Sequence, residues 1–288
     1  MRPVSGAELG RDRGIALLAV ISVLTVLSLL SVAILDISRT AVLHARRAGD
    51  LMRAEAELEG AFWQSAFLVL EGAGALDPAF TPAGRLQDGG SGTIVVRIRA
   101  EAGKVDLNTG DEAAIAALFR AAGLDDGRAA AQAAAVADWR DEDDLRRLNG
   151  AERRDYAAAG LKDMPPNRPF ADILELARVL GVTSDMLACV LEDSTLYSQL
   201  LAPRPDLASP PLARALGHSG GRGEPFHPVP GDTIAIDVRM LDEEGTARFA
   251  RRWVLRLTGN RTDPLHILER RDWGPMLAAA THCPGGRP

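Results

Sequence analysis

Residues 15–35 read IALLAVISVLTVLSLLSVAIL, a run of 21 residues without charge, proline or glycine. At about 1.5 Å of rise per residue, a helix of this length crosses the roughly 30 Å hydrocarbon core of a membrane. The leader of residues 1–14 carries Arg11 and Arg13 just before the apolar run, and basic flanks stay in the cytoplasm. We therefore predict a single span over residues 15–37, with the following domain on the far side of the membrane.

The same run could belong to a cleaved secretory signal, but it is longer than the usual apolar region of about 7–15 residues and lacks a small-residue cleavage site. The helical pattern also continues beyond it. No proline occurs between Pro3 and Pro78, and Leu51, Leu58 and Phe62 recur on one helical face. This pattern predicts an amphipathic stalk that packs against a domain on one side only.

Three later segments alternate between apolar and polar residues and predict strands at residues 93–101, 234–240 and 253–257. The acidic, glycine-containing residues 242–245 separate the last two strands and favour a hairpin. We expect these strands to form a small antiparallel sheet that is covered by the end of the long helix.

The residues between the first strand and the last two are predominantly helical in pattern. Thr109 and Glu112 fit a capping box at the start of the first helix. Seven prolines and five glycines within residues 202–231 predict a loop. The expected helices cover residues 113–122, 128–139, 150–159, 170–180 and 185–191.

These patterns predict an α+β fold in which a helical domain is inserted into a sheet domain. The stalk and first strand occupy residues 38–102, and the all-α insertion occupies residues 103–200. A linker over residues 201–231 leads to the remaining strands and the tail, residues 232–288.

Composition narrows the function. Lys and Arg total 33 against 39 Asp and Glu, a net charge of −6, which argues against nucleic-acid binding through bulk positive charge. The five histidines are scattered, and neither a nucleophile elbow nor a phosphate loop occurs, so we do not expect an enzyme. Cys189 is either an apolar core residue or, outside the cytoplasm, a disulfide partner of Cys283.

The densest polar cluster covers residues 138–144, with further acids at Glu152 and Asp155. Ca²⁺ takes six to eight oxygen ligands, which clustered carboxylates supply, although the spacing is not that of an EF-hand. The alternative is a solvated helix end whose acids pair with Arg146 and Arg147.

Residues 103–109 and 170–176 resemble parts of helix-hairpin-helix modules, which hold DNA phosphates on backbone amides. Their acidic surroundings favour a helical domain of similar topology that does not bind DNA. A membrane-tethered helix-hairpin-helix DNA receptor remains the alternative function, and a signal-anchored hydrolase that uses the acidic cluster is a third.

The leader ending in Gly14, followed by an apolar helix and a soluble α/β layer, resembles type IV pilins and pseudopilins. The helical region more specifically resembles the K-type minor pseudopilin of bacterial type II secretion, the GspK family. The segments that carry this resemblance are GKVDLNTGDEAAIAALF (103–119), AAVADWRDEDD (134–144), GAERRDY (150–156), PPNRPFADILELARVLGVT (165–183) and STLYS (194–198).

The resemblance implies a pilin-like long N-terminal helix on the sheet. It also implies that the prepilin peptidase cleaves after Gly14 and that the new N-terminal residue, Ile15, is methylated. Ala19 then stands where most pilins carry Glu, and the K-type subunit also lacks Glu at this place.

The family's role implies a subunit at the tip of the pseudopilus, which begins assembly with the I-type and J-type minor pseudopilins and meets the major pseudopilin. This apparatus exports folded proteins across the outer membrane. The resemblance implies no nucleic-acid partner, and it places the chain in the inner membrane with its C-terminal domain in the periplasm. Family members bind Ca²⁺, for which the candidate ligands here are Asp141, Asp143, Asp144 and Glu152.

Overall fold

The computed structural model describes residues 8–72, 93–218, 226–242, 244–272 and 283, with the side chains of residues 8–16 and 33–42 left out. The chain separates into two compact units, Met1–Ala56 and Glu57–Pro288. Helix α1 (Glu8–Leu70) begins in the first unit and ends in the second. This agrees with the continuous helix that the sequence predicts.

In the first unit, the described side chains of residues 17–32 are exposed. The predicted span of residues 15–37 also includes side chains that lie outside the described residues, at 15–16 and 33–37. Among the residues that are described, no helix combines the length and the apolar character needed to cross a membrane.

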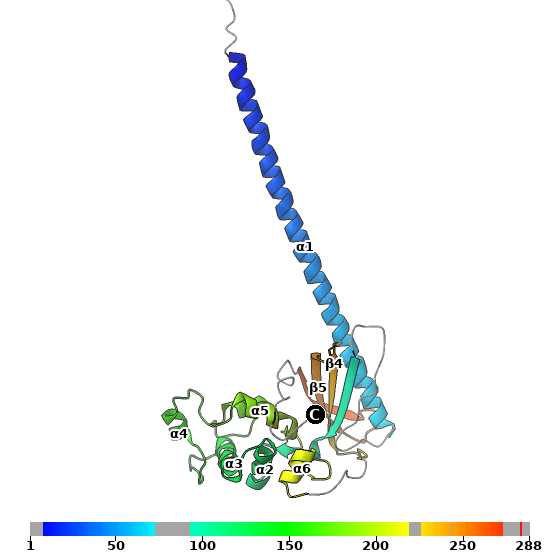
Figure 1. Ribbon diagram of the computed structural model, residues 1–288. Coiled ribbons are helices and arrows are strands. Elements are labelled where there is room, and N and C mark those ends of the chain that lie inside the picture. Colours follow the sequence, from blue (N-terminus) through cyan, green and yellow to red (C-terminus); the bar gives the residue numbers. More distant parts are fainter. Residues whose placement is uncertain (1–7, 73–92, 219–225, 243, 273–282, 284–288) are drawn as a thin grey trace, which may run out of the picture. The chain divides into compact units, whose positions relative to one another are not determined.

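The second unit is built on a four-stranded antiparallel sheet with strand order β1-β4-β5-β6 (Figure 1). Its strands are β1 (Thr93–Ala100), β4 (Thr233–Leu241), β5 (Ala247–Leu257) and β6 (Leu265–Asp272). β1 pairs with β4, so the strands on the two sides of the insertion lie in one sheet. The prediction of a mixed helical and antiparallel fold is confirmed, as is the β4–β5 hairpin.

Strand β6 was not predicted from the sequence. Its residues read LHILERRD and follow no regular apolar alternation. It lies at the edge of the sheet, where charged residues are common, and its register with β5 shifts between Val254 and Leu255. The sequence pattern of a buried strand is therefore absent.

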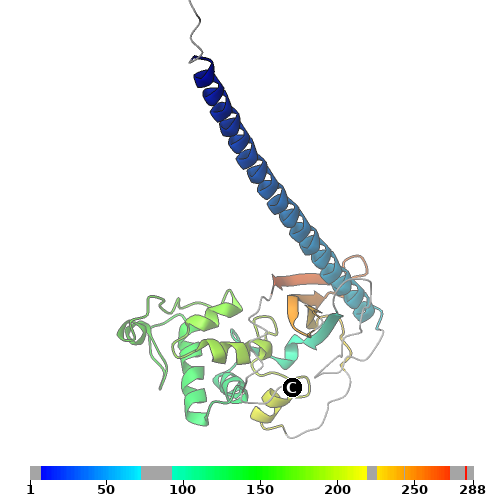
Figure 2. The ribbon, with the colours of Figure 1, turned by 45° about the horizontal axis from the view of Figure 1, so that its top comes forward.

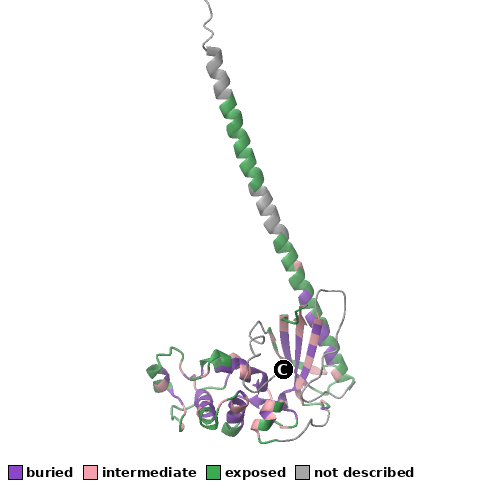
Figure 3. Ribbon diagram, viewed as in Figure 1, coloured by how far each residue is buried: buried purple, intermediate pink, exposed green. Residues whose placement is uncertain are grey.

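The last turns of α1 cover the sheet within the second unit. Leu58, Phe62 and Ala66 are buried against inward-facing residues of β1, β4 and β5. The ring of Phe62 stacks on Trp253 of β5 with centroids 4.5 Å apart. Figure 3 shows the alternating buried residues of the strands beside this part of the helix. This apolar contact forms the first core of the unit.

The inserted residues have a second core of their own, which includes Ile115, Phe119, Trp139, Tyr156 and Leu191. In Figures 1 and 2 the inserted helices α2, α3 and α5 gather to one side of the strands. The elements between β1 and β4 are η1 (Glu101–Gly103), β2 (Val105–Asp106), α2 (Glu112–Ala121), α3 (Asp126–Arg140), α4 (Arg153–Ala158), η2 (Ile173–Arg178), α5 (Ser184–Val190), η3 (Leu191–Asp193), β3 (Ser194–Thr195) and α6 (Pro210–Ala215).

Two local predictions in this region are wrong. The cap of α2 is Asp111, whose Oδ1 accepts a hydrogen bond of 2.7 Å from the amide of Ala114, whereas the Thr109 hydroxyl donates to the carbonyl of Leu200. The predicted loop of residues 202–231 contains α6, which Ser209 caps and which begins at Pro210. Proline suits the first helical position because the amide that it lacks would be unpaired there.

Two of the five expected helices are shorter than predicted. Residues 150–159 contain only α4, and residues 170–180 contain only the 3₁₀ helix η2. Of the two alternatives for Cys189, the structure contains the disulfide with Cys283, with Cα atoms 5.6 Å apart. The bond ties the C-terminal tail to helix α5.

Candidate metal centre

The acidic cluster lies on the loop between α3 and α4. α3 ends at Arg140, and Asp141 is its C-cap residue. Glu152 is the N-cap residue of α4, and its amide donates a hydrogen bond of 2.9 Å to Oδ2 of Asp155. The two helix ends therefore hold the first and last acids of the loop in fixed positions.

Three of the predicted ligands come together here. Asp141, Asp143 and Glu152 each offer a carboxylate oxygen, and these oxygens all lie within 4.8 Å of one another. Glu152 is 4% exposed, and its side chain faces the backbone of Asp155 in the capping box of α4. Within the described part of the chain, neither of its carboxylate oxygens has a donor in hydrogen-bond geometry. The same holds for the buried Oδ1 of Asp141. Buried carboxylates without partners are costly unless a cation compensates them.

Electrostatics agrees with this geometry. Burial raises the pKa of Glu152 to about 7, and the negative charges of Asp138, Asp141, Asp144 and Asp143 add to the effect. An oxygen-rich site of this kind suits a hard divalent cation such as Ca²⁺, which supplies the missing positive charge. The residues present therefore fit the ion that the sequence predicted.

The guanidinium of Arg147 connects three of the acids around the loop. Its guanidinium donates to Oδ1 of the fully buried Asp138 at 2.8 Å, to Glu112 at 2.9 Å, and to Asp141. Hydrogen bonds to Asp141 and Asp138 raise the pKa of Arg147, so it stays charged. Burial nevertheless raises the pKa of Asp138 in spite of the arginine.

Gly150 lets the loop pass close to this pair. A Cβ atom at this position would overlap the Asp138 carboxylate and lie 3.2 Å from the Cβ atom of Arg147. Only glycine fits without displacing the buried acid.

Asp144, the fourth predicted ligand, lies outside the group of three. Its Oδ1 accepts a hydrogen bond of 2.9 Å from Asn167 and is 3.4 Å from Nε of Arg153. Asn167 also donates to the carbonyl of Asp143 at 2.8 Å, and its buried Oδ1 has no hydrogen-bond partner among the described residues. Asn167 is thus a candidate ligand or loop support that the sequence did not single out.

The predicted processing residues lie on α1. Gly14 and Ile15 belong to the part of the helix whose side chains fall outside the described residues, whereas Ala19 is exposed.

No curated protein matches the sequence significantly. One chain in the crystal structure of the GspK–GspI–GspJ complex from the type 2 secretion system of enterotoxigenic Escherichia coli is similar. The TM-score is 0.52 and the identity 15%, and the match covers 77% of this chain and 99% of that chain. At this identity the likeness concerns the fold.

The family described as type II secretion system (T2SS), protein K, matches residues 97–192. This range begins in β1, contains the acidic loop and ends in η3, so it coincides with most of the insertion. The match confirms the resemblance predicted from the sequence: over residues 97–192, a third of its length, the chain is similar to the type II secretion protein K family.

Proposed function

We propose that this protein is a minor pseudopilin that occupies the tip of a type II secretion pseudopilus and begins its assembly with I-type and J-type minor pseudopilins. The observation that carries the proposal is the protein K domain, inserted between β1 and β4 of the sheet. The similar solved structure is a complex of GspK with GspI and GspJ. The major pseudopilin and the prepilin peptidase are the further partners that we expect.

The shape of the second unit supports a place at the filament end. The insertion has its own core and gathers to one side of the strands (Figure 2). A subunit widened in this way is most easily accommodated where no subunit follows it in a helical array. Ala19 fits the same position, because a tip subunit has no neighbour above it whose N-terminal amine would need a glutamate.

We further propose that α1 is the pilin-like helix and that its apolar segment anchors the precursor in the inner membrane. Cleavage between Gly14 and Ile15, with methylation of Ile15, would then precede assembly. The head would lie in the periplasm, and the Cys189–Cys283 disulfide supports an oxidising compartment.

The test of this role replaces the gene for the protein by variants in a secreting bacterium. Ala19→Glu should insert normally but disturb tip assembly, seen as reduced recovery of the I-type and J-type subunits with the tagged protein. Ser22→Glu, about one helical turn later, is the matched control: it places the same charge at another exposed position of the segment and should leave this recovery unchanged. Normal recovery and secretion with Ala19→Glu would show that the missing glutamate is incidental.

We also propose that Asp141, Asp143 and Glu152 hold a structural Ca²⁺ ion, with Asp144 and Asn167 at its border. The bound ion would neutralise the buried carboxylates and fix the loop. A ligand that binds only the folded state adds about 2.7 kcal/mol of stability at a hundredfold excess over its dissociation constant.

Millimolar Ca²⁺ should therefore raise the melting temperature of the full-length protein, and Glu152→Gln should abolish the rise. Asp163→Asn, which neutralises an exposed acid of the insertion, is the matched control and should keep it. An equal rise in Glu152→Gln and the wild type would exclude this site. Failure of the calcium test would leave the assembly proposal standing, because the two have separate readouts.

A further inference from the structure

The second unit contains two hydrophobic cores, which meet through a few apolar residues and through charged residues. Leu207, which follows β3, is buried in the core of the sheet, and Ala250 of β5 packs against the core of the insertion. We call residues 105–216 the insertion lobe, and residues 57–104 with 226–272, so far as they are described, the sheet lobe. Four ion pairs among the described residues join the two lobes. Each has its arginine on the sheet lobe and its acid on the insertion lobe. The arginines are Arg97, Arg99, Arg239 and Arg271, and the acids are Asp172, Glu192 and Asp193.

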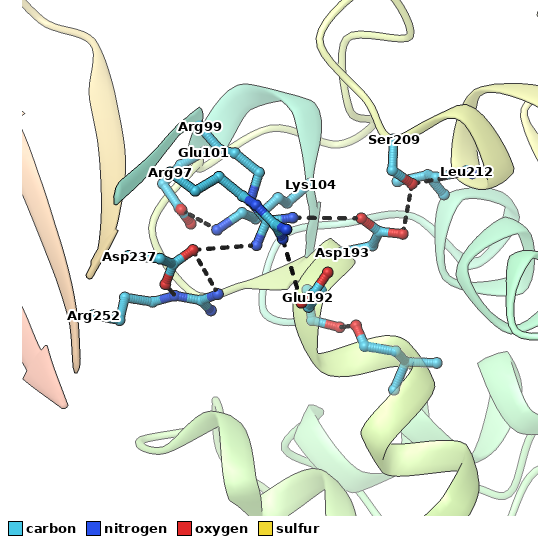
Figure 4. A network of polar contacts seen from close by, with 12 residues as sticks. Arg97, Arg99, Glu101, Lys104, Glu192, Asp193, Ser209, Leu212, Asp237 and Arg252 are labelled. Atoms are coloured by element: carbon cyan, nitrogen blue, oxygen red, sulfur yellow. Dashed lines mark hydrogen bonds and ion pairs between the residues drawn. The ribbon is translucent and has the colours of Figure 1, made fainter. Parts of the chain in front are cut away.

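Glu192 and Asp193 stand at the centre of this contact, on the short helix η3 (Figure 4). Oε1 of Glu192 lies 3.5 Å from a guanidinium nitrogen of Arg97 and accepts a hydrogen bond of 3.2 Å from Arg239. Oδ1 of Asp193 lies 3.9 Å from a guanidinium nitrogen of Arg99. The two consecutive acids thus contact arginines from two strands.

Asp193 also reaches back into its own lobe. Its Oδ2 accepts a hydrogen bond of 2.7 Å from the hydroxyl of Ser209, the N-cap residue of α6. The acid therefore connects Arg99 of β1 with the start of a helix in the insertion lobe. Glu192 and Asp193 are 8% and 3% exposed, so water screens these contacts little.

On the sheet lobe, the contact rests on a buried ion-pair network. Asp237 of β4 accepts hydrogen bonds of 2.5 and 3.2 Å from Arg252 of β5, and lies 3.6 Å from Arg99. Burial alone would raise the pKa of Asp237, but Arg252 and Arg99 outweigh it and hold that pKa far below its usual range. Arg99 is thus placed by a buried acid of its own lobe before it meets Asp193.

Buried ion pairs add little net stability compared with apolar packing, because both charges must leave water. Their directional bonds can instead select one arrangement of the groups that they join. Contacts between domains that are polar in this way also permit relative motion when they are broken. The disulfide at Cys189, three residues before Glu192, keeps this corner of the insertion lobe tied to Cys283.

We propose that the ion pairs of Glu192 and Asp193 fix the orientation of the insertion lobe on the sheet lobe. Removal of these ion pairs lets the lobes turn relative to each other while each lobe stays folded. The protein K domain is then a separately folded unit whose presentation to partners depends on two residues at its border.

Hydrogen exchange measured by mass spectrometry on the full-length protein in detergent tests this directly. In Glu192→Gln/Asp193→Asn, amides at the junction, residues 191–195 and 204–208, should exchange at least tenfold faster than in the wild type. Amides within α3 and β5 should stay within twofold of the wild type. The control Asp163→Asn, an exposed acid of the insertion lobe beside Arg178, should change neither group.

Two results would overturn the proposal. Unchanged exchange at the junction would show that the acids do not hold the lobes together. Equal acceleration in α3 and β5 would show that they only contribute to the stability of the whole unit. If the double variant does not fold, Glu192→Gln alone, which retains the contact between Asp193 and Ser209, is judged by the same two criteria.

Discussion

Replacing Gly150 by Ala should destabilise the protein through Asp138. The added Cβ would overlap the Asp138 carboxylate, which is fully buried and accepts hydrogen bonds from the guanidinium of Arg147 at 2.8 Å and from its amide at 3.2 Å. The hydrogen bond from the charged guanidinium contributes about 1.5–3 kcal/mol to the free energy of unfolding, and the bond from the uncharged amide contributes about 1 kcal/mol. Displacing the acid should therefore cost about 3 kcal/mol of unfolding free energy.

For a unit of this size, about 1 kcal/mol shifts the melting temperature by about 2–4 °C, so we expect a decrease of about 6–12 °C. Thermal and urea unfolding followed by circular dichroism would measure it. Gly127→Ala is the matched control: its new Cβ would lie 3.4 Å from Asp125 in the first turn of α3, where alanine is tolerated. The control should keep or slightly raise stability. Equal stability of Gly150→Ala and the wild type would refute the claim that Asp138 and Arg147 are fixed against the loop.

Three further predictions concern other parts of the second unit. Cys189→Ala/Cys283→Ala should lower the unfolding free energy by about 4–5 kcal/mol in urea titrations, because the disulfide closes a loop across 94 residues; a loss below about 1 kcal/mol would contradict this. Burial lowers the pKa of Lys104 to about 8, although the charge of Glu101 acts to raise it. The unfolded state therefore binds more protons than the folded state above pH 8. Stability should thus rise by about 1 kcal/mol between pH 8 and 9, and Lys104→Met should lose this rise; equal slopes in both proteins would contradict it. Asn167→Ala should lower Ca²⁺ affinity roughly tenfold in calorimetric titration, since the amide hydrogen bonds that fix the acidic loop are each worth about 1 kcal/mol or more; unchanged affinity would remove Asn167 from the site.

The elements that could be predicted from the sequence are those whose pattern is local. The alternation of residues 93–101 and 234–240 predicts β1 and β4 because one face of each strand is buried. Strand β6 has no such pattern, because an edge strand buries little. The loop around residue 210 reads as irregular from its prolines, although a proline after a capping serine also begins a helix.

The acidic cluster shows the same limit at the level of the site. Clustered acids in residues 141–144 and Glu152 predict a cation site, because carboxylates are the ligands of such ions. The choice among them depends on tertiary structure: Asp143 turns toward Glu152, whereas Asp144 is engaged by Arg153 and Asn167. Asn167 comes from a loop that follows α4, and no local pattern connects it with the cluster.

The burial of Glu192 and Asp193 could not be predicted from the sequence. Two acids after an apolar helix are usually solvated, and nothing in the residues 191–193, Leu-Glu-Asp, predicts that both are buried. Their burial is tolerated because Arg97 and Arg99 contact them from a strand that lies some ninety residues earlier in the chain. Arg239 of β4 and the hydroxyl of Ser209 add hydrogen bonds to Glu192 and Asp193, respectively. Most of the apolar residues of each lobe lie in its own core, so we infer that the opposite charges at the border orient one lobe on the other. We therefore expect changes inside the insertion to leave the sheet unaltered as long as the acids at its border still meet the arginines of β1.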